Sequence, residues 1–315
     1  MNTPPKLGDI ILAYERIRPY VHRTPVMTSE SLNHLSGASL FFKCENFQKG
    51  GAFKARGAFN AVFSLSADEA QNGVLTHSSG NHAAALSIAA RARKIPAYIV
   101  MPSSAPAVKK AAVISYGGKI TFCEPTLTSR IETANRLIAE TNAVMIHPYD
   151  DYQIIAGAAT AAYEFLEDVP VLDYICVPVG GGGLISGTVL STHYIKPRTK
   201  IVGCEPHNAD DAYRSFHENR VVPIENPATI ADGLRTMLSE KTFGIIKKYV
   251  DDIITVTEEE IITAMRTVWE RMKIIIEPSS AVAVAPVLSG KLSVPGKRVG
   301  IIISGGNVDL GNLPF

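Results

Sequence analysis

The chain has 315 residues, of which 46% are hydrophobic and 19% are charged, a composition that excludes a disordered or fibrous protein. Its 31 basic and 30 acidic residues give a net charge of +1, so nothing points to nucleic acid or an anionic membrane as a partner. The length exceeds a single small core, and we expect two lobes or one α/β domain with an insert.

The start of the chain, MNTPPKLGDI, has neither the basic end nor the apolar stretch of a signal peptide. No window approaches the ~18 apolar residues that a membrane span needs. Cys44, Cys123, Cys176 and Cys204 lie far apart and form no C-x-x-C pair, so we expect neither a zinc site nor a disulfide framework. The sequence therefore predicts a cytoplasmic protein with buried, reduced thiols.

Short apolar runs alternate with helix-period segments along almost the whole chain. Several runs are apolar on both faces, as parallel strands covered by helices are. The predicted strands are 39–45, 73–77, 97–101, 119–124, 143–148, 174–179, 200–205, 252–256 and 298–304. This alternation predicts a doubly wound parallel sheet that binds its ligand at the carboxyl ends of the strands.

The clearest helix between these strands is 257–273. Thr257 and Glu260 have the spacing of a capping box. The residues of its apolar stripe, which we expect in the core, are Ile261, Met265, Val268, Trp269 and Met272.

Four turns follow predicted strands, and the first contains a lysine. In KGGAFKARG (49–57), Lys54 stands behind two glycines, Ala52 and Phe53, and a helix is expected to follow it. On this stretch alone Lys54 is either a surface charge or a buried nucleophile. In the second turn, Ser78, Ser79, Gly80 and Asn81 open a helix, where free N–H groups and hydroxyls suit a carboxylate as well as a plain N-cap.

The third turn is a run of glycines, Gly180, Gly181, Gly182 and Gly183, between a buried strand and an apolar helix. Glycine lets backbone N–H groups approach an anion, and a helix N-terminus adds a positive dipole, so this turn predicts a phosphate site. It matches neither G-x-G-x-x-G nor a Walker motif, which argues against a Rossmann dehydrogenase. The fourth turn, Ser304–Asn307, offers a hydroxyl to a ligand ring nitrogen or merely closes the turn.

A phosphate site, a carboxylate site and a glycine-flanked lysine together indicate pyridoxal 5'-phosphate (PLP). Its aldehyde forms a Schiff base with lysine, and its amino-acid substrate brings the carboxylate. A protein that only binds PLP or an amino acid remains an alternative, which a turnover assay for 2-oxo acid would test.

Five segments in order, GGAFKARGAFN, THSSGNHAAAL, PVGGGGLISG, EPSSAVAV and SGGNVD, resemble the fold-type II PLP enzymes over nearly the whole chain. The branch is similar to serine/threonine ammonia-lyases, threo-3-hydroxyaspartate ammonia-lyases and serine racemases. The resemblance implies an α/β, two-domain, tryptophan synthase β-like fold. The large PLP-binding domain would comprise 1–66 and 150–315, and the small mobile domain 67–149.

The resemblance also implies the roles of individual residues. Lys54 would hold PLP and act as the base at Cα, for which a neutral amine is required. Phe53 would pack beside the cofactor, and Asn81 would bind the pyridoxal hydroxyl. The glycines Gly180–Gly183 would hold the phosphate, and Ser304 would face the pyridine nitrogen. The substrate contacts would be Ser78, Ser79, Gly80, Asn81, His82 and Arg130.

The inferred reaction is β-elimination of water from L-serine, L-threonine or a related 3-hydroxy amino acid, giving a 2-oxo acid and ammonia. Ser79 leaves a serine racemase as an alternative, because racemisation needs a second acid/base on the face opposite the lysine. Arg130 matches an arginine that relatives aim at an acidic ligand, although on its own it also fits an exposed helix charge. If it points into the cleft, L-threo-3-hydroxyaspartate is favoured.

Two further features follow from the resemblance. Glu205, Asp211 and the carbonyl of Ala209 match the family's loop for Mg²⁺, Mn²⁺ or Ca²⁺, whereas alone they would be a solvated acidic loop. A homodimer is implied, and so is a nucleotide effector between subunits. Ala84 argues against the effector, because relatives often have glutamine there, although Tyr116 and Lys273 remain.

Overall fold

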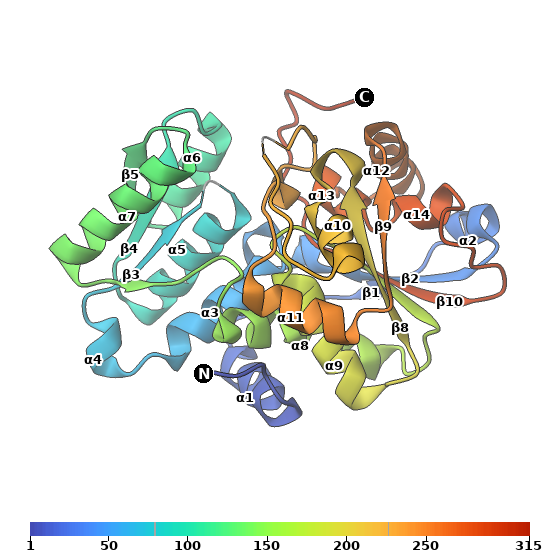
Figure 1. Cartoon of the computed structure of the whole chain (residues 1–315), viewed down its shortest axis with the longest axis horizontal. Coiled ribbons are helices and arrows are strands. Elements are labelled where there is room, and N and C mark those ends of the chain that lie inside the picture. Colours follow the sequence, from blue (N-terminus) through green and yellow to red (C-terminus); the bar gives the residue numbers. More distant parts are fainter. Residues whose placement is uncertain (79, 226) are drawn as a thin grey trace.

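The computed structural model describes residues 1–78, 80–225 and 227–315. Two helix-covered sheets lie at opposite ends of the long axis of the molecule (Figure 1). The strands are β1 (Val26–Met27), β2 (Ser39–Cys44), β3 (Val74–His77), β4 (Ala97–Pro102), β5 (Lys119–Cys123), β6 (Val144–Met145), β7 (Tyr174–Pro178), β8 (Lys200–Pro206), β9 (Asp252–Val256) and β10 (Arg298–Ile303).

The helices divide between the two sheets. The α-helices are α1 (Leu7–Ile17), α2 (Glu30–Ser36), α3 (Lys54–Ser64), α4 (Ala67–Ala70), α5 (Asn81–Arg93), α6 (Ala107–Ser115), α7 (Leu127–Thr141), α8 (Tyr152–Asp168), α9 (Gly183–Ile195), α10 (Asp211–Glu218), α11 (Glu240–Tyr249), α12 (Glu258–Met272), α13 (Pro278–Ala281) and α14 (Ala285–Leu288). The 3-10 helices are η1 (Glu45–Phe47), η2 (Lys49–Gly51), η3 (His207–Ala209) and η4 (Asp232–Leu234).

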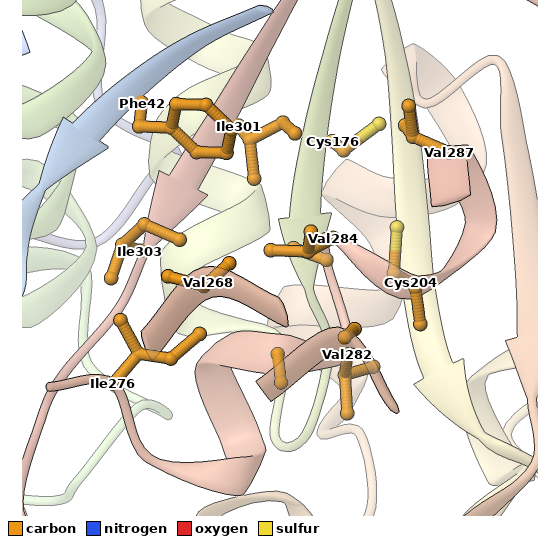
Figure 2. Packing of buried hydrophobic residues seen from close by; sticks show 14 of the residues in the cluster. Phe42, Cys176, Cys204, Val268, Ile276, Val282, Val284, Val287, Ile301 and Ile303 are labelled. Carbon is orange, nitrogen blue, oxygen red and sulfur yellow. The ribbon is translucent and has the colours of Figure 1, made fainter. Parts of the chain in front are cut away.

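The larger sheet has the strand order β1-β2-β10-β7-β8-β9 and is parallel except for β1, which pairs antiparallel with β2. Alternate residues of β10 face opposite sides. Ile301 and Ile303 pack with α12, α13 and α14, as Figure 2 shows, whereas Ile302 joins the core formed with α8, α9 and α11. The predicted doubly wound, mostly parallel fold is therefore confirmed.

The smaller sheet has the order β5-β4-β3-β6, and all its pairings are parallel. Val74 and Ile99 pack with α3 and α5, and Leu75 and Val100 pack with α7. All four strands lie within the stretch predicted as the small domain. The boundaries of that domain and its mobility stay a prediction.

Every predicted strand is present, although the one predicted over 143–148 shrinks to β6, Val144–Met145. The predicted capping box of α12 is formed, because Thr257 Oγ1 accepts from Glu260 N and Glu260 Oε2 accepts from Thr257 N at 2.7 Å. All cysteines are free and buried, as predicted. Within the described ranges, no helix is both long and apolar enough to cross a membrane.

Helix α8 is the common support of the two helices that begin at candidate site residues. A Cβ on Gly157 of α8 would lie 2.5 Å from the carbonyl oxygen of Arg56 on α3. On its other side, a Cβ on Gly187 of α9 would lie 2.6 Å from the backbone nitrogen of Ala159. These close crossings hold the starts of α3 and α9 at fixed places on one rigid helix.

Candidate active site

The turn before Lys54 needs its glycines. Gly50 and Gly51 both have positive φ (69° and 72°), and a Cβ on Gly51 would lie 2.5 Å from Asn307 Oδ1. The chain then enters α3 at Lys54, whose Nζ donates to the carbonyl oxygen of Pro148 at 3.0 Å. The ammonium also lies 5.0 Å from the centre of the Phe53 ring.

Lys54 is a half-buried amine with a lowered proton affinity. Burial lowers its pKa to about 8, and the negative charge of Glu277 opposes that shift only in part. A larger fraction of Lys54 is therefore neutral near physiological pH than of an exposed lysine. A neutral amine is the form that attacks an aldehyde or removes a proton.

A second turn, Ser304–Asn307, is fastened to the lysine turn. Phe53 N donates to Ser304 O at 2.9 Å, and Gly306 N donates to Gly51 O at 2.9 Å. The Ser304 side chain is buried, with its Oγ 3.0 Å from Ser280 Oγ. Two turns that are far apart in sequence are thus joined into one wall next to Lys54.

The glycine run Gly180–Gly183 is closely surrounded. A Cβ on Gly180 would lie 3.0 Å from Leu234 Cα, and one on Gly181 would lie 2.4 Å from the ring of Tyr149. Gly182 has φ +84° and caps α9, whose first N–H groups have no partner within the helix. Ser186 Oγ in the same helix is buried and has no partner among the described residues. A tetrahedral anion fits these donors.

The turn after β3 opens α5. Ser78 N donates to Val100 O at 3.1 Å, and Ser78 Oγ accepts from Gly80 N at 3.4 Å. Gly80 has open space around its Cα, and Asn81 is the first residue of α5. Ser79, which we predicted as a catalytic residue, lies outside the described residues.

Three histidines meet behind this turn, although the sequence pointed only to His82. Burial lowers the pKa of His82 to about 3, and its Nε2 lies 3.3 Å from Ile146 O. His77 and His147 have ring centres 5.5 Å apart, and burial followed by the charge of neighbouring groups lowers the pKa of both. The rings of His147 and Tyr149 pack edge to face, with their centres 4.7 Å apart. All three rings are therefore neutral near pH 7.

Arg130 of α7 comes close to His77. Its positive charge is the second cause, after burial, of the lowered pKa of that imidazole. Arg130 Nε is buried and finds no hydrogen-bond acceptor in the part of the chain that the structure describes. A buried guanidinium N–H without an acceptor is costly, so this geometry suits an anionic ligand.

Glu205, near the end of β8, and Asp211, at the start of α10, approach each other. The Glu205 carboxylate accepts from Ala212 N at 3.0 Å and Tyr213 N at 2.8 Å, and Asp211 Oδ2 accepts from Leu238 N at 3.2 Å. Burial raises the pKa of Asp211 to about 7, and burial followed by the charge of Asp211 raises that of Glu205. Asp211 Oδ1 is buried without a partner among the described residues.

Ala209 lies in the 3-10 helix between these carboxylates, and it is buried. No group of three or more His, Cys, Asp or Glu side chains that could hold a metal is found in the described part of the chain. A site here would therefore consist of the two carboxylates, a backbone carbonyl and water, a donor set that suits Mg²⁺, Mn²⁺ or Ca²⁺.

The sequence did not reveal the importance of Glu277 and Asn307. Glu277 is 4% exposed and accepts from Asn81 Nδ2 at 2.9 and 3.1 Å. Asn307 Nδ2 donates to Asn81 Oδ1 at 2.9 Å and to Gly50 O at 2.7 Å. Both residues stand in segments that carried the family resemblance, EPSSAVAV and SGGNVD. That membership was the signal from which sequence reasoning could have identified them.

A buried charge cluster, formed by Lys43, Glu45, Arg56 and Glu164, fixes the first turn of α3. Arg56 Nε and Nη2 donate to the two oxygens of Glu45 at 2.7 and 2.8 Å. Its Nη1 and Nη2 donate to the two oxygens of Glu164 at 2.9 and 2.7 Å. Lys43 Nζ donates to Glu164 at 2.8 Å. The cluster has two cationic and two anionic members, and its Arg56 lies two residues after Lys54.

Comparison with known proteins identifies the family of the chain. Residues 17–305 match the family model described as "Pyridoxal-phosphate dependent enzyme". The chain is 50% identical to a beta-hydroxyaspartate dehydratase from Paracoccus denitrificans, covering 99% of each chain. It is 53% identical to a serine racemase from Arabidopsis thaliana, covering 96% of this chain and 92% of that one. The structure of maize serine racemase superposes with a TM-score of 0.96 at 45% identity, over 97% of this chain and 94% of that one. The chain therefore belongs to the family of pyridoxal-phosphate dependent enzymes.

Proposed function

We propose that this protein removes water from a 3-hydroxy amino acid by a PLP-dependent β-elimination, and that water then hydrolyses the enamine product to a 2-oxo acid and ammonia. The observation that carries the proposal is the Lys54 amine, whose pKa is lowered to about 8 and which stands in a wall of two joined turns. The relatives named serine racemase and beta-hydroxyaspartate dehydratase support the same substrate class.

The proposal assigns the following roles to the main predicted site residues. Lys54 holds the cofactor and moves the proton at Cα. The glycine run and the start of α9 bind the phosphate, and Ser304 faces the ring nitrogen. When bound, the cofactor supplies the electron sink that makes the Cα proton removable. The start of α5 binds the substrate carboxylate, and the small domain closes over it to exclude water.

Among possible substrates we favour an acidic one, L-threo-3-hydroxyaspartate. Arg130 has a buried Nε without an acceptor among the described residues and lies near the neutral His77. A side-chain carboxylate of the substrate would satisfy that N–H and supply a counter-charge to Arg130. Serine and threonine carry no such group and leave the buried Nε–H without an acceptor among the described residues.

Arg130→Gln is expected to raise the KM for L-threo-3-hydroxyaspartate about 10- to 100-fold, which corresponds to the loss of one charge-assisted hydrogen bond. The KM for L-serine is expected to change little. The measurement is steady-state 2-oxo acid formation from L-serine, L-threonine and L-threo-3-hydroxyaspartate. Arg136→Gln, an exposed change in the same helix, is the control. An equal effect on serine and hydroxyaspartate would contradict this role of Arg130.

A serine racemase is the second candidate function, supported by relatives of that name. Ser79 would then act as the acid/base on the face opposite Lys54. Chiral analysis of products from L-serine decides between the two, because an ammonia-lyase forms pyruvate without D-serine. The Ser79→Ala variant is expected to lose racemisation selectively if racemisation occurs.

We further propose a divalent cation between Glu205, Asp211 and the carbonyl of Ala209. Asp211 Oδ1, which has no partner among the described residues, and the negative charge of Asp211 beside the buried Glu205 carboxylate support it. At a 100-fold excess over its Kd, Mg²⁺ or Ca²⁺ is expected to stabilise the fold by about 2.7 kcal/mol, seen as a rise in Tm. Asp211→Asn is expected to abolish that rise. A rise of the same size in Asp211→Asn would place the cation elsewhere.

The remaining partners are proposed from the resemblance. We expect a homodimer, which sedimentation would reveal. Nucleotide activation is not expected, because the buried Ala84 offers a methyl group and no hydrogen bond to a nucleotide, although Tyr116 and Lys273 are present. Turnover with and without added ATP would test this expectation.

A further inference from the structure

The buried carboxylate of Glu277 has no role in the function proposed above, although it lies inside the same site. Glu277 is the N-cap residue of α13, its side chain makes no hydrogen bond to that helix, and its backbone N–H donates to Gly305 O at 3.1 Å. A Cβ on Gly305 would lie 2.9 Å from Glu277 Oε1. Glu277 is also close enough to Lys54 to influence the pKa of its amine. The carboxylate therefore stands next to both turns that surround Lys54.

Hydrogen bonds to Glu277 and from Asn307 fix the orientation of the Asn81 side-chain amide. Nδ2 donates to Glu277 at 2.9 and 3.1 Å, and Oδ1 accepts from Asn307 Nδ2 at 2.9 Å. The Asn307 amide is fixed in turn, because its Nδ2 also donates to the carbonyl of Gly50 at 2.7 Å. With Glu277 ionised, a flipped Asn81 amide would turn its oxygen to a carboxylate and its NH₂ to another NH₂, so only one orientation satisfies all these groups.

The orientation decides what Asn81 can offer a ligand. Its oxygen is occupied by Asn307, and one of its two N–H hydrogens is occupied by Glu277. One N–H donor remains. A ligand group beside the Asn81 amide therefore faces a hydrogen-bond donor and not an acceptor. A donor stabilises the ionised form of a ligand hydroxyl and disfavours the protonated form.

We propose that Glu277 is a positioning residue that turns the free N–H of Asn81 toward the pyridoxal hydroxyl and so keeps that hydroxyl ionised. This inference rests on the proposed function and on the expectation, implied by the family resemblance, that Asn81 binds the pyridoxal hydroxyl. Glu277 acts through Asn81 and needs no contact with the cofactor. Asn307 assists by occupying the acceptor end of the same amide.

Glu277→Gln tests the proposal. Glutamine keeps the size of the side chain, but its NH₂ can donate to Asn81 Oδ1 and so permits the flipped amide. The measurement is the visible spectrum of the PLP-loaded enzyme, in which bound cofactor with an ionised hydroxyl and with a protonated hydroxyl absorb in separate bands. The ratio of the ionised to the protonated band is expected to fall about twofold to tenfold, the range for one net hydrogen bond.

Other variants separate positioning from a general loss of stability. Asn81→Ala is expected to lower the band ratio, and the Asn81→Ala/Glu277→Gln double variant is expected to lower it no further. Glu260→Gln is the control, because its carboxylate also accepts a backbone N–H but belongs to the cap of α12. That variant is expected to keep the wild-type ratio.

The outcomes are distinguishable. A wild-type ratio in Glu277→Gln, or a further fall in the double variant, overturns the role of Glu277 and leaves the proposed function standing. A wild-type protein that forms no cofactor band overturns the proposed function, and this inference with it. If Glu277→Gln does not fold, Asn307→Ala replaces it, and this variant is expected to lower the ratio in the same direction. An unchanged ratio in that variant overturns the inference equally.

Discussion

Lys54→Ala is expected to remove both the absorbance of lysine-bound cofactor and turnover, with a loss of about 10³-fold or more in kcat. Among the described residues of the two joined turns, Lys54 carries the amine placed to bind the aldehyde of the cofactor covalently. The same amine is the proposed base at Cα, so one substitution removes two functions. The measurements are the visible spectrum after addition of PLP and the rate of 2-oxo acid formation.

Lys49→Ala is the matched control, because Lys49 precedes the same glycine pair but its Nζ faces the ring of Phe59 at 6.0 Å. This variant is expected to keep the cofactor absorbance. The lowered pKa adds a second check: attachment of PLP to the apoenzyme is expected to accelerate as the pH rises through about 8 and to level off above it, since only the neutral amine reacts. A Lys54→Ala enzyme that turns over at the wild-type rate would contradict the assignment.

Arg56→Met is expected to lower the free energy of unfolding by about 3–5 kcal/mol. Burial alone would lower the pKa of the guanidinium, but Glu45 and Glu164 raise it above its ordinary value, so Arg56 remains charged in the core. Its removal leaves those two carboxylates with Lys43 as their one cationic partner in the cluster. The measurement is equilibrium denaturation by urea.

Arg266→Met is the control for this experiment. Its ion pair with Glu270 is exposed, with 61% and 53% of the two side chains accessible. Water already screens that pair, so no measurable change in the denaturation midpoint is expected. A small effect of Arg56→Met would show that the cluster is not what holds the first turn of α3. A large effect of Arg266→Met would show that arginine removal destabilises this protein wherever it occurs.

Local pattern was sufficient for most of the fold. Strands buried on both faces, such as β7 and β10, were predicted because parallel strands under helices are continuously apolar. The capping box at Thr257 fixed the start of α12. The strand β1 was missed because two residues, Val26 and Met27, are too few to show an alternation of apolar and polar side chains. Their pairing with β2 is what makes them a strand.

The site was predictable where one short segment carries the chemistry and was missed where distant segments meet. Lys54 and the glycine run could be recognised from the sequence, because both turns contain residues with positive φ, which favours glycine. Glu277 and His147 gain importance only from neighbours far along the chain, Asn81 and His77, which no local pattern identifies. Ser79 stays a prediction, since it lies outside the described residues.

Borohydride reduction of the PLP-loaded enzyme, followed by peptide mapping, tests the central claim most directly. Reduction makes the bond between the cofactor and its lysine permanent, so the modified residue is identified by mass. The account predicts a single pyridoxyl group on the peptide that contains Lys54, at one equivalent per chain. A pyridoxyl group on another lysine, or none on any peptide, would contradict it.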